Sequence, residues 1–190
     1  GTGHSDLSDI LLMPTVGEML TEPGTAAMPE TGYRSRFSHE RERAEAGYYE
    51  VMLDDYGIRA QLTATEHVGV HRYTYPAGEA QHLILDLEHA IYNYEGKTRW
   101  AHVRVESDTL ITGYRITSGW ARTNYTYFAM TFSKPILHYR TRDRRPLDYR
   151  GGWGKFDTEH DFPEVAGCSL VMAFDFGDAP APLELSLIHI

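Results

Sequence analysis

Apolar and polar residues alternate with a period of two along most of the chain, which is the pattern of half-buried β-strands. This alternation runs from Tyr49 to Leu53 and from Ile58 to Thr65, on either side of the turn residues Asp54-Asp55-Tyr56-Gly57, and so predicts a β-hairpin. Further strands are predicted over residues 67–75, 82–87, 100–106, 110–117 and 124–133. Turn residues separate these segments, so the pattern favours an all-β fold, an antiparallel β-sandwich.

Helix signals are few. Residues 38–44 have the composition for one or two helical turns with Ser38 as N-cap, ended by Gly47, and we interpret this run as a solvated connection. Residues 140–154 mix arginines with acidic residues and glycines, and are expected to form a long excursion from the sheet.

Length and charge limit the function. The 190 residues suit one large domain, or a domain and a fragment. The formal net charge of −9 argues against a nucleic-acid partner or an anionic membrane surface, because both call for a basic face. No apolar run approaches the ~20 residues that a membrane helix needs, so no membrane span is predicted. A neutral, polar substrate fits this composition better.

The single cysteine and the histidines give weak chemical signals. Cys168 has no partner in the sequence for an intrachain disulfide, and its apolar surroundings predict a buried structural thiol. His67 and His71 are expected on one face of a strand, with His82 and His89 flanking the next. Zinc sites use such imidazoles, but no third ligand has matching spacing, so no metal site is predicted.

Carboxylates and tryptophans were considered for a hydrolytic or sugar-binding role. Glu66, Asp86 and Glu88 fall on predicted strands or their ends, and no pair stands out as an acid and a base, so no catalytic residue is assigned. Trp120 lies in a predicted turn, where it either serves function or closes the sandwich core, and Trp153 leaves the same two alternatives open.

The first ten residues form a polar stretch, GTGHSDLSDI, with two glycines around a hydroxyl. Glycine allows positive φ and a close approach of the backbone to a ligand, so the stretch has the character of a binding loop. A plain surface turn is the alternative. A chain that opens within such a loop is expected to be part of a longer protein.

Three long blocks carry a resemblance to a known family. They are GTGHSDLSDILLMPTVGE, TGYRSRFSHERERAEAGYYEVMLDDYGIRAQLTATEHVGVHRYTYP and TLITGYRITSGWARTNYTYFAMTFSKP. In this order they resemble the N-terminal domain of glycoside hydrolase family 92, the calcium-dependent α-mannosidases. The likeness covers residues 1–185, whereas residues 186–190 do not continue the family pattern and are interpreted as a non-matching tail. The Ser/His/Thr-rich segment that usually precedes the glycine loop is also missing.

The resemblance implies the N-terminal domain of a two-domain glycosidase. A larger helical domain would follow the β-sandwich, with the active site in the cleft between them. The general acid, the base and the calcium ligands of this inverting exo-α-mannosidase would belong to the helical domain, so neither catalytic nor metal-binding residues are expected here. The expected partners are that helical domain and α-mannoside glycans, either N-glycans or mannans, and the expected location is periplasmic or secreted.

The resemblance also implies site residues. Gly1, Thr2 and Gly3 match the family's glycine-rich loop, which would contribute to the sugar pocket, and His4 follows at a variable position where it would help to choose the leaving sugar. A second set, Trp120, Arg122 and Asn124, falls in the GWARTNYTYF block and is expected to close the sandwich or to face the cleft and the helical domain.

Two hypotheses of different class remain. In the first, the chain is the accessory half of an α-mannosidase and is inactive alone. In the second, it is a free-standing, non-catalytic carbohydrate-binding β-sandwich that uses Trp120 and Trp153 as a sugar platform.

Overall fold

The computed structural model describes residues 10–90, 96–143 and 164–189, and within these ranges almost all regular structure is β-strand. The strands are β1 (Leu11–Thr15), β2 (Glu42–Glu45), β3 (Tyr48–Leu53), β4 (Ile58–Ala64), β5 (Val68–Thr74), β6 (His82–Asp86), β7 (Thr98–Ser107), β8 (Leu110–Thr117), β9 (Asn124–Phe132), β10 (His138–Asp143), β11 (Glu164–Gly167), β12 (Leu170–Asp175) and β13 (Leu183–His189). Two short 3-10 turns, η1 (Pro29–Thr31) and η2 (His39–Arg41), complete the list, and the described ranges hold no α-helix.

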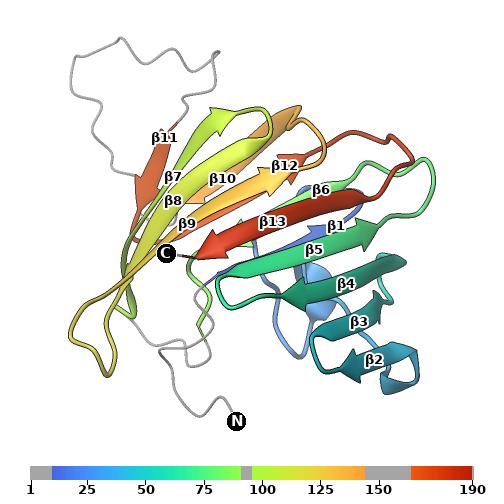
Figure 1. Cartoon of the computed structure of the whole chain (residues 1–190), viewed down its shortest axis with the longest axis horizontal. Helices are drawn as coiled ribbons and strands as arrows, with labels where there is room; N and C mark the ends of the chain where they lie inside the picture. The colour runs from blue at the N-terminus through green and yellow to red at the C-terminus, as the bar shows by residue number, and fades with distance from the viewer. Residues whose placement is uncertain (1–9, 91–95, 144–163, 190) are drawn as a thin grey trace.

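The strands form two antiparallel sheets that pack face to face (Figure 1). The small sheet has the order β1-β6-β12-β10, and the large sheet has the order β11-β7-β8-β9-β13-β5-β4-β3-β2. The prediction of an all-β, antiparallel sandwich is therefore confirmed. The predicted hairpin corresponds to β3 and β4, joined by a turn in which Gly57 adopts φ +62°, a left-handed conformation that favours glycine.

The main core lies between the two sheets. Leu83 and Leu85 of β6 and Met172 of β12 point into it, as do Ile111 and Met130 from the large sheet. The small sheet is also buried on its other face, where Ile84, Val171 and Ala173 pack with Tyr33, Met19 and Leu20. Because both faces are covered, β6 and β12 are buried at nearly every position rather than alternating between buried and exposed.

β13 occupies the middle of the large sheet. It pairs with β5 on one side, where Leu185 lies opposite His71, and with β9 on the other, where Leu185 lies opposite Phe132. Residues 186–189, which the sequence presented as a tail, continue this strand, with Ile188 opposite both Val68 and Ala129. The last described strand therefore joins two halves of the sheet that are far apart in sequence.

Two segments differ from the sequence predictions. Ser38 does cap η2, since its side chain accepts a hydrogen bond from the Glu40 backbone N–H, but residues 42–45 form the edge strand β2 instead of continuing a helix. Residues 138–143 form β10, another edge strand, instead of leaving the sheet. Both are edge strands, so they carry many charged side chains and lack the apolar alternation of central strands. The rest of the 140–154 span lies outside the described residues.

The position of β13 gives a prediction about stability. Leu185 is 3% exposed in the main core, so Leu185→Ala should lower the free energy of unfolding by about 2–4 kcal/mol. Ile188 lies on the same strand and is 41% exposed, so Ile188→Ala should cost about 1 kcal/mol or less. Urea unfolding of both variants measures the difference, and equal losses would contradict the central placement of β13.

Candidate functional site

Several strands begin or end beside Asp86, the last residue of β6. Leu11 of β1 and Val171 of β12 lie opposite Asp86 in the small sheet. The large sheet reaches the same place, since the Thr98 hydroxyl at the start of β7 lies 3.5 Å from the Leu87 carbonyl oxygen, to which it donates. We call this region the Asp86 end of the sandwich. The chain before Ile10, after Ala90 and after Asp143 connects to the sandwich here.

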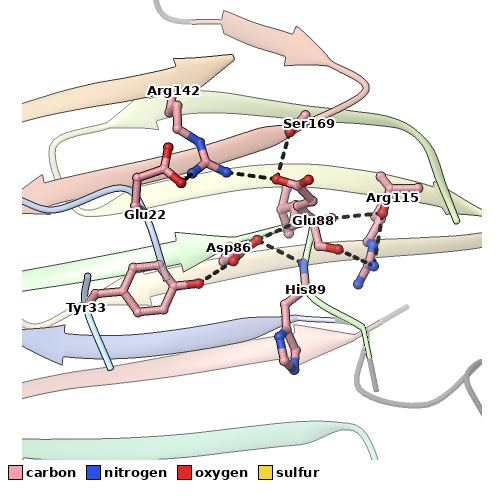
Figure 2. Close-up of polar contacts among 10 residues, drawn as sticks. Glu22, Tyr33, Asp86, Glu88, His89, Arg115, Arg142 and Ser169 are labelled. Atoms are coloured by element: carbon pink, nitrogen blue, oxygen red, sulfur yellow. Dashed lines mark hydrogen bonds and ion pairs between the residues drawn. The ribbon is translucent and has the colours of Figure 1, made fainter. Parts of the chain in front are cut away.

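Asp86 is 4% exposed, and its carboxylate holds the segment that follows β6. Its Oδ1 accepts hydrogen bonds from the backbone N–H groups of Glu88, at 2.7 Å, and His89, at 2.9 Å. Its Oδ2 accepts a hydrogen bond from the Tyr33 hydroxyl (Figure 2). Burial, reinforced by the adjacent carboxylate, raises the pKa of Tyr33 far above its usual value, so this hydroxyl remains a donor. The Asp86 carboxylate thus fixes the backbone of the following turn.

Glu88 belongs to a neighbouring ion-pair network. Its Oε2 accepts hydrogen bonds from Arg142 Nη2 at 2.8 Å and from the Ser169 hydroxyl at 2.7 Å. The other terminal nitrogen of Arg142 forms an ion pair with Glu22, so one guanidinium lies between two carboxylates (Figure 2). A carboxylate in such contacts is satisfied as an anion. These contacts support the structural role that the sequence favoured for Asp86 and Glu88.

A close backbone crossing brings Glu22 and Tyr33 to this network. A Cβ atom on Gly32 would lie 2.0 Å from Gly24 N and 2.4 Å from the Glu22 carbonyl oxygen. Only glycine fits there, and the crossing is closed by a 2.9 Å hydrogen bond from Tyr33 N–H to the Glu22 carbonyl. Residues 22–33 therefore form a tight loop over the outer face of the small sheet.

Arg115 links the large sheet to the same end. It is 1% exposed on the inward face of β8, and its Nη2 donates to Thr98 Oγ1 at 3.1 Å and lies 3.5 Å from the Glu88 carbonyl oxygen. The sequence analysis missed this residue. The sequence signal that could have identified Arg115 is its place on the inward face of an alternating strand, two residues before Thr117, where an arginine is rarely buried without partners.

His89 follows the cluster and differs from it. Its imidazole points away from the Asp86 and Glu88 carboxylates (Figure 2). Burial lowers the pKa of His89, although the nearby Asp86 opposes that effect, so the ring is neutral at pH 7. A neutral imidazole offers one donor and one acceptor, which suits contact with a polar, uncharged group.

The predicted site residues fall into two sets. Gly1, Thr2, Gly3 and His4 lie outside the described residues. The second set lies at the Asp86 end, with Trp120 and Arg122 in the connection between β8 and β9 and Asn124 as the first residue of β9. Trp120 is 82% exposed and therefore does not close the sandwich core, which was one of the two roles considered for it.

The connection between β8 and β9 is itself anchored to the start of β7. Ser118 N–H donates to the Lys97 carbonyl at 2.9 Å, and the Ser118 hydroxyl donates to the Gly96 carbonyl at 3.1 Å. Arg122 is exposed and Asn124 is half-buried. The connection thus presents exposed polar and aromatic side chains on a fixed base, while Trp153 lies outside the described residues.

The histidines considered for a metal are separated in the fold. His67 is exposed beside Glu66, with 3.7 Å between Nε2 and Oε1, whereas His71 Nδ1 lies 2.7 Å from the Tyr73 hydroxyl. Within residues 10–90, 96–143 and 164–189, no three His, Cys, Asp or Glu side chains come together as a metal site. The carboxylates at the Asp86 end are already bound to cations and N–H donors, so they do not fit a calcium cage.

Two smaller observations complete the comparison with the sequence. Cys168 lies between β11 and β12 and is half-buried, so the prediction of a buried thiol is wrong. Only residues 168 and 169 connect β11 of the large sheet to β12 of the small sheet, and Cys168 is the first residue of this connection rather than part of the buried strand. Among the described residues there is no helix with the length and apolarity required to cross a membrane.

Comparison with known proteins identifies close relatives. The family model described as the glycosyl hydrolase family 92 N-terminal domain matches residues 1–185. The solved structure of the family GH92 α-mannosidase BT3965 from Bacteroides thetaiotaomicron, in complex with mannoimidazole, is 33% identical, with a TM-score of 0.81, over 96% of this chain and 23% of that chain. Comparison with curated protein sequences gives no match.

Two further solved structures agree. The GH92 family glycosyl hydrolase ccman5 is 25% identical, with a TM-score of 0.71, over 95% of this chain and 23% of that chain. The inverting mannosidase BT2199 from Bacteroides thetaiotaomicron is 24% identical, with a TM-score of 0.68, over 95% of this chain and 21% of that chain, and supports the fold. The chain therefore spans less than a quarter of the length of these relatives.

The cluster at the Asp86 end predicts which substitutions destabilise the fold. Asp86→Ala removes the acceptor of three hydrogen bonds and should lower the free energy of unfolding by about 3 kcal/mol or more. Tyr33→Phe removes one donor and should cost about 1–3 kcal/mol. Tyr127→Phe, at a residue 47% exposed, is the matched control with little effect. Urea unfolding tests this order, and an unchanged Asp86→Ala variant would contradict the anchoring role.

Proposed function

Because this chain belongs to the glycosyl hydrolase family 92 N-terminal domain family, we propose that it is the accessory β-sandwich of an inverting, calcium-dependent exo-α-mannosidase. The observation that carries the proposal is the match of residues 1–185 to the family model, together with a shared fold over 96% of the chain with a solved α-mannosidase. The remaining three quarters of such an enzyme would hold the helical domain and the reacting groups.

The chemistry of the described carboxylates supports this division of labour. An inverting glycosidase needs a general acid and a general base about 6.5–9.5 Å apart, with a water between the base and the sugar. Asp86 is buried with three donors, and Glu88 is bound to Arg142 and Ser169. Both anions are committed to structural contacts. In our proposal the acid, the base and the calcium ligands come from the helical domain, and the isolated chain is inactive.

We place the cleft at the Asp86 end. Leu11 lies opposite Asp86, so the described chain begins at the end of the sandwich that also carries the exposed Trp120, and the glycine-rich loop Gly1-Thr2-Gly3 and His4 precede this point in the sequence. β13 also runs toward this end, since its pairing with β9 begins with Leu185 opposite Phe132 and continues to His189 opposite Phe128, in the middle of β9. In this arrangement the sandwich and the helical domain meet around the sugar, and Trp120, Arg122 and Asn124 face the cleft or the helical domain.

The proposed role of the first four residues is to bind substrate. Two glycines permit the backbone to approach a sugar closely, and backbone N–H and C=O groups suit hydroxyls. His4 would contact the leaving sugar and so influence which linkage is cleaved. The substrates would be terminal α-mannosides of N-glycans or mannans, handled in the periplasm or after secretion.

An activity assay tests the division of labour. We expect the 190-residue chain to hydrolyse no 4-nitrophenyl α-mannoside, because in our proposal the acid and the base belong to the helical domain. The full-length protein should hydrolyse it, should lose activity with a calcium chelator and regain it with added calcium, and should release β-mannose first, as detected by NMR. Hydrolysis by the 190-residue chain would refute the proposal, and so would full activity in the presence of the chelator.

A second experiment addresses His4. In the full-length protein, His4→Ala should change the ratio of kcat/KM values between α-1,2- and α-1,3-linked mannobiose by about tenfold, if one polar contact to the leaving sugar is lost. The rate on 4-nitrophenyl α-mannoside, whose leaving group is not a sugar, should change little. An unchanged linkage ratio would remove His4 from the proposed site.

A further inference from the structure

A second polar site lies on the outer face of the large sheet, across the adjacent strands β3, β4, β5 and β13 (Figure 1). Strand register places two rows of side chains there: Tyr48, Thr63, Val70 and Ser186 in one, and Glu50, Gln61, Arg72 and Glu184 in the other. A hollow of about 220 Å³, which we call the outer groove, is lined by residues of both rows. Pockets for drug-sized ligands start at about 300 Å³, so this space suits a single small ring.

The polar groups of the outer groove are held in place by one another. The Tyr48 hydroxyl donates to Glu50 Oε2 at 2.5 Å and accepts from Gln61 Nε2 at 2.8 Å. On the other side, Arg72 Nε donates to Glu184 Oε1 at 2.7 Å. Side chains that are already ordered lose less conformational entropy when a ligand binds. The side chains of the outer groove therefore need little further ordering when a ligand binds.

The charges of the outer groove cancel. Arg59 Nη2 lies 2.7 Å from Glu50 Oε2, and this hydrogen bond lowers the pKa of Glu50, so the carboxylate stays ionised. Arg72 and Glu184 form the second pair, with 2.6 Å between Nη2 and Oε1. A site with two balanced ion pairs has no net attraction for a phosphate or a metal ion. Its polar atoms instead suit a neutral ligand that both donates and accepts hydrogen bonds.

Apolar surface completes the site. Val70, which lines the outer groove, is 40% exposed and gives the groove apolar surface. Tyr48 lines the same groove, with Thr63 of β4 between it and Val70 in the strand register, and Arg43 Cζ lies 5.5 Å from the centroid of the Tyr48 ring. Carbohydrate rings present an apolar face and a rim of hydroxyls. An apolar floor beside ordered amide, guanidinium and carboxylate groups matches both features.

We propose that the outer groove is a non-catalytic binding site for one pyranose ring of an α-mannoside glycan, separate from the cleft at the Asp86 end. Tyr48 and Val70 contact the apolar face of the sugar, while Gln61, Arg72 and Glu184 bond its hydroxyls. The choice of an α-mannoside rests on the proposed function. Such a site holds a second branch of a glycan while another branch is trimmed.

Titration calorimetry of the 190-residue chain with methyl α-D-mannopyranoside tests the proposal. We expect weak, saturable binding, and Tyr48→Ala and Arg72→Ala should each weaken it by about tenfold. Arg72 is an exposed surface residue, so its variant is expected to remain folded, which thermal unfolding checks. Tyr127→Ala, on the outer face of the same sheet and 47% exposed, is the matched control with unchanged affinity.

Several outcomes would contradict the proposal that the outer groove binds a sugar. Absence of saturable binding by the wild-type chain is one, and unchanged affinity in the folded Arg72→Ala variant is another. In the full-length protein, labelling of an Arg72→Cys variant by a thiol reagent can be compared with labelling of its parent, both on a Cys168→Ser background, and no labelling beyond that of the parent would show that polypeptide covers the groove. That result also excludes a glycan site there.

Hydrolysis by the full-length protein separates this proposal from the proposed function. Tyr48→Ala and Arg72→Ala should leave the rate on 4-nitrophenyl α-mannoside unchanged. If the full-length protein hydrolyses no α-mannoside, the proposed function fails. If the wild-type 190-residue chain nevertheless binds the sugar and both variants lose that binding, the proposed sugar site in the outer groove is still supported. If hydrolysis is normal and the chain binds no sugar, the outer groove alone fails.

Discussion

The pairing of β13 with both β5 and β9 is the constraint on which the large sheet depends. Without it, the group β2–β5 and the group β7–β9 with β11 would share no hydrogen-bonded neighbour. The connection that leads into β13 is secured by Lys134, which is 8% exposed and donates to Gln81 Oε1 at 2.7 Å and to the Ala179 carbonyl at 2.8 Å. Burial lowers the pKa of Lys134, yet its acceptors make it a firm anchor. The pairing of β13 thus makes one continuous sheet of the two groups of strands.

The two candidate sites lie on two different surfaces of the sandwich, one at an end where strands stop and one on the outer face of the large sheet. At the Asp86 end, strands of both sheets stop together, and buried charges hold the turns in place. On the outer face of the large sheet, the same β-pleat that buries Leu185 directs Glu184 and Ser186 outward. The first region is the place where a neighbouring domain would meet the sandwich, and the second faces away from the small sheet.

The sequence predicted the central strands well because the burial of their side chains follows from the alternation of apolar and polar residues within each strand. Leu83, Leu85 and Leu87 share one face, as expected, and all three lie in the main core. The edge strands β2 and β10 were missed because an edge exposes its side chains and needs no apolar alternation. The polar cluster was missed for a different reason. Its pairs join residues 53 positions apart, for Tyr33 and Asp86, and 81 positions apart, for Glu88 and Ser169, and no local pattern encodes such contacts.

The central claim is that the Asp86 end faces the catalytic part of a longer α-mannosidase. Hydrogen–deuterium exchange of backbone amides, compared between the full-length protein and the 190-residue chain, tests it most directly. The account predicts slower exchange in the full-length protein for residues 118–123, which carry Trp120, and unchanged exchange along β3 and β4 beside the outer groove. Slower exchange along β3 and β4 with no change at residues 118–123 would contradict it.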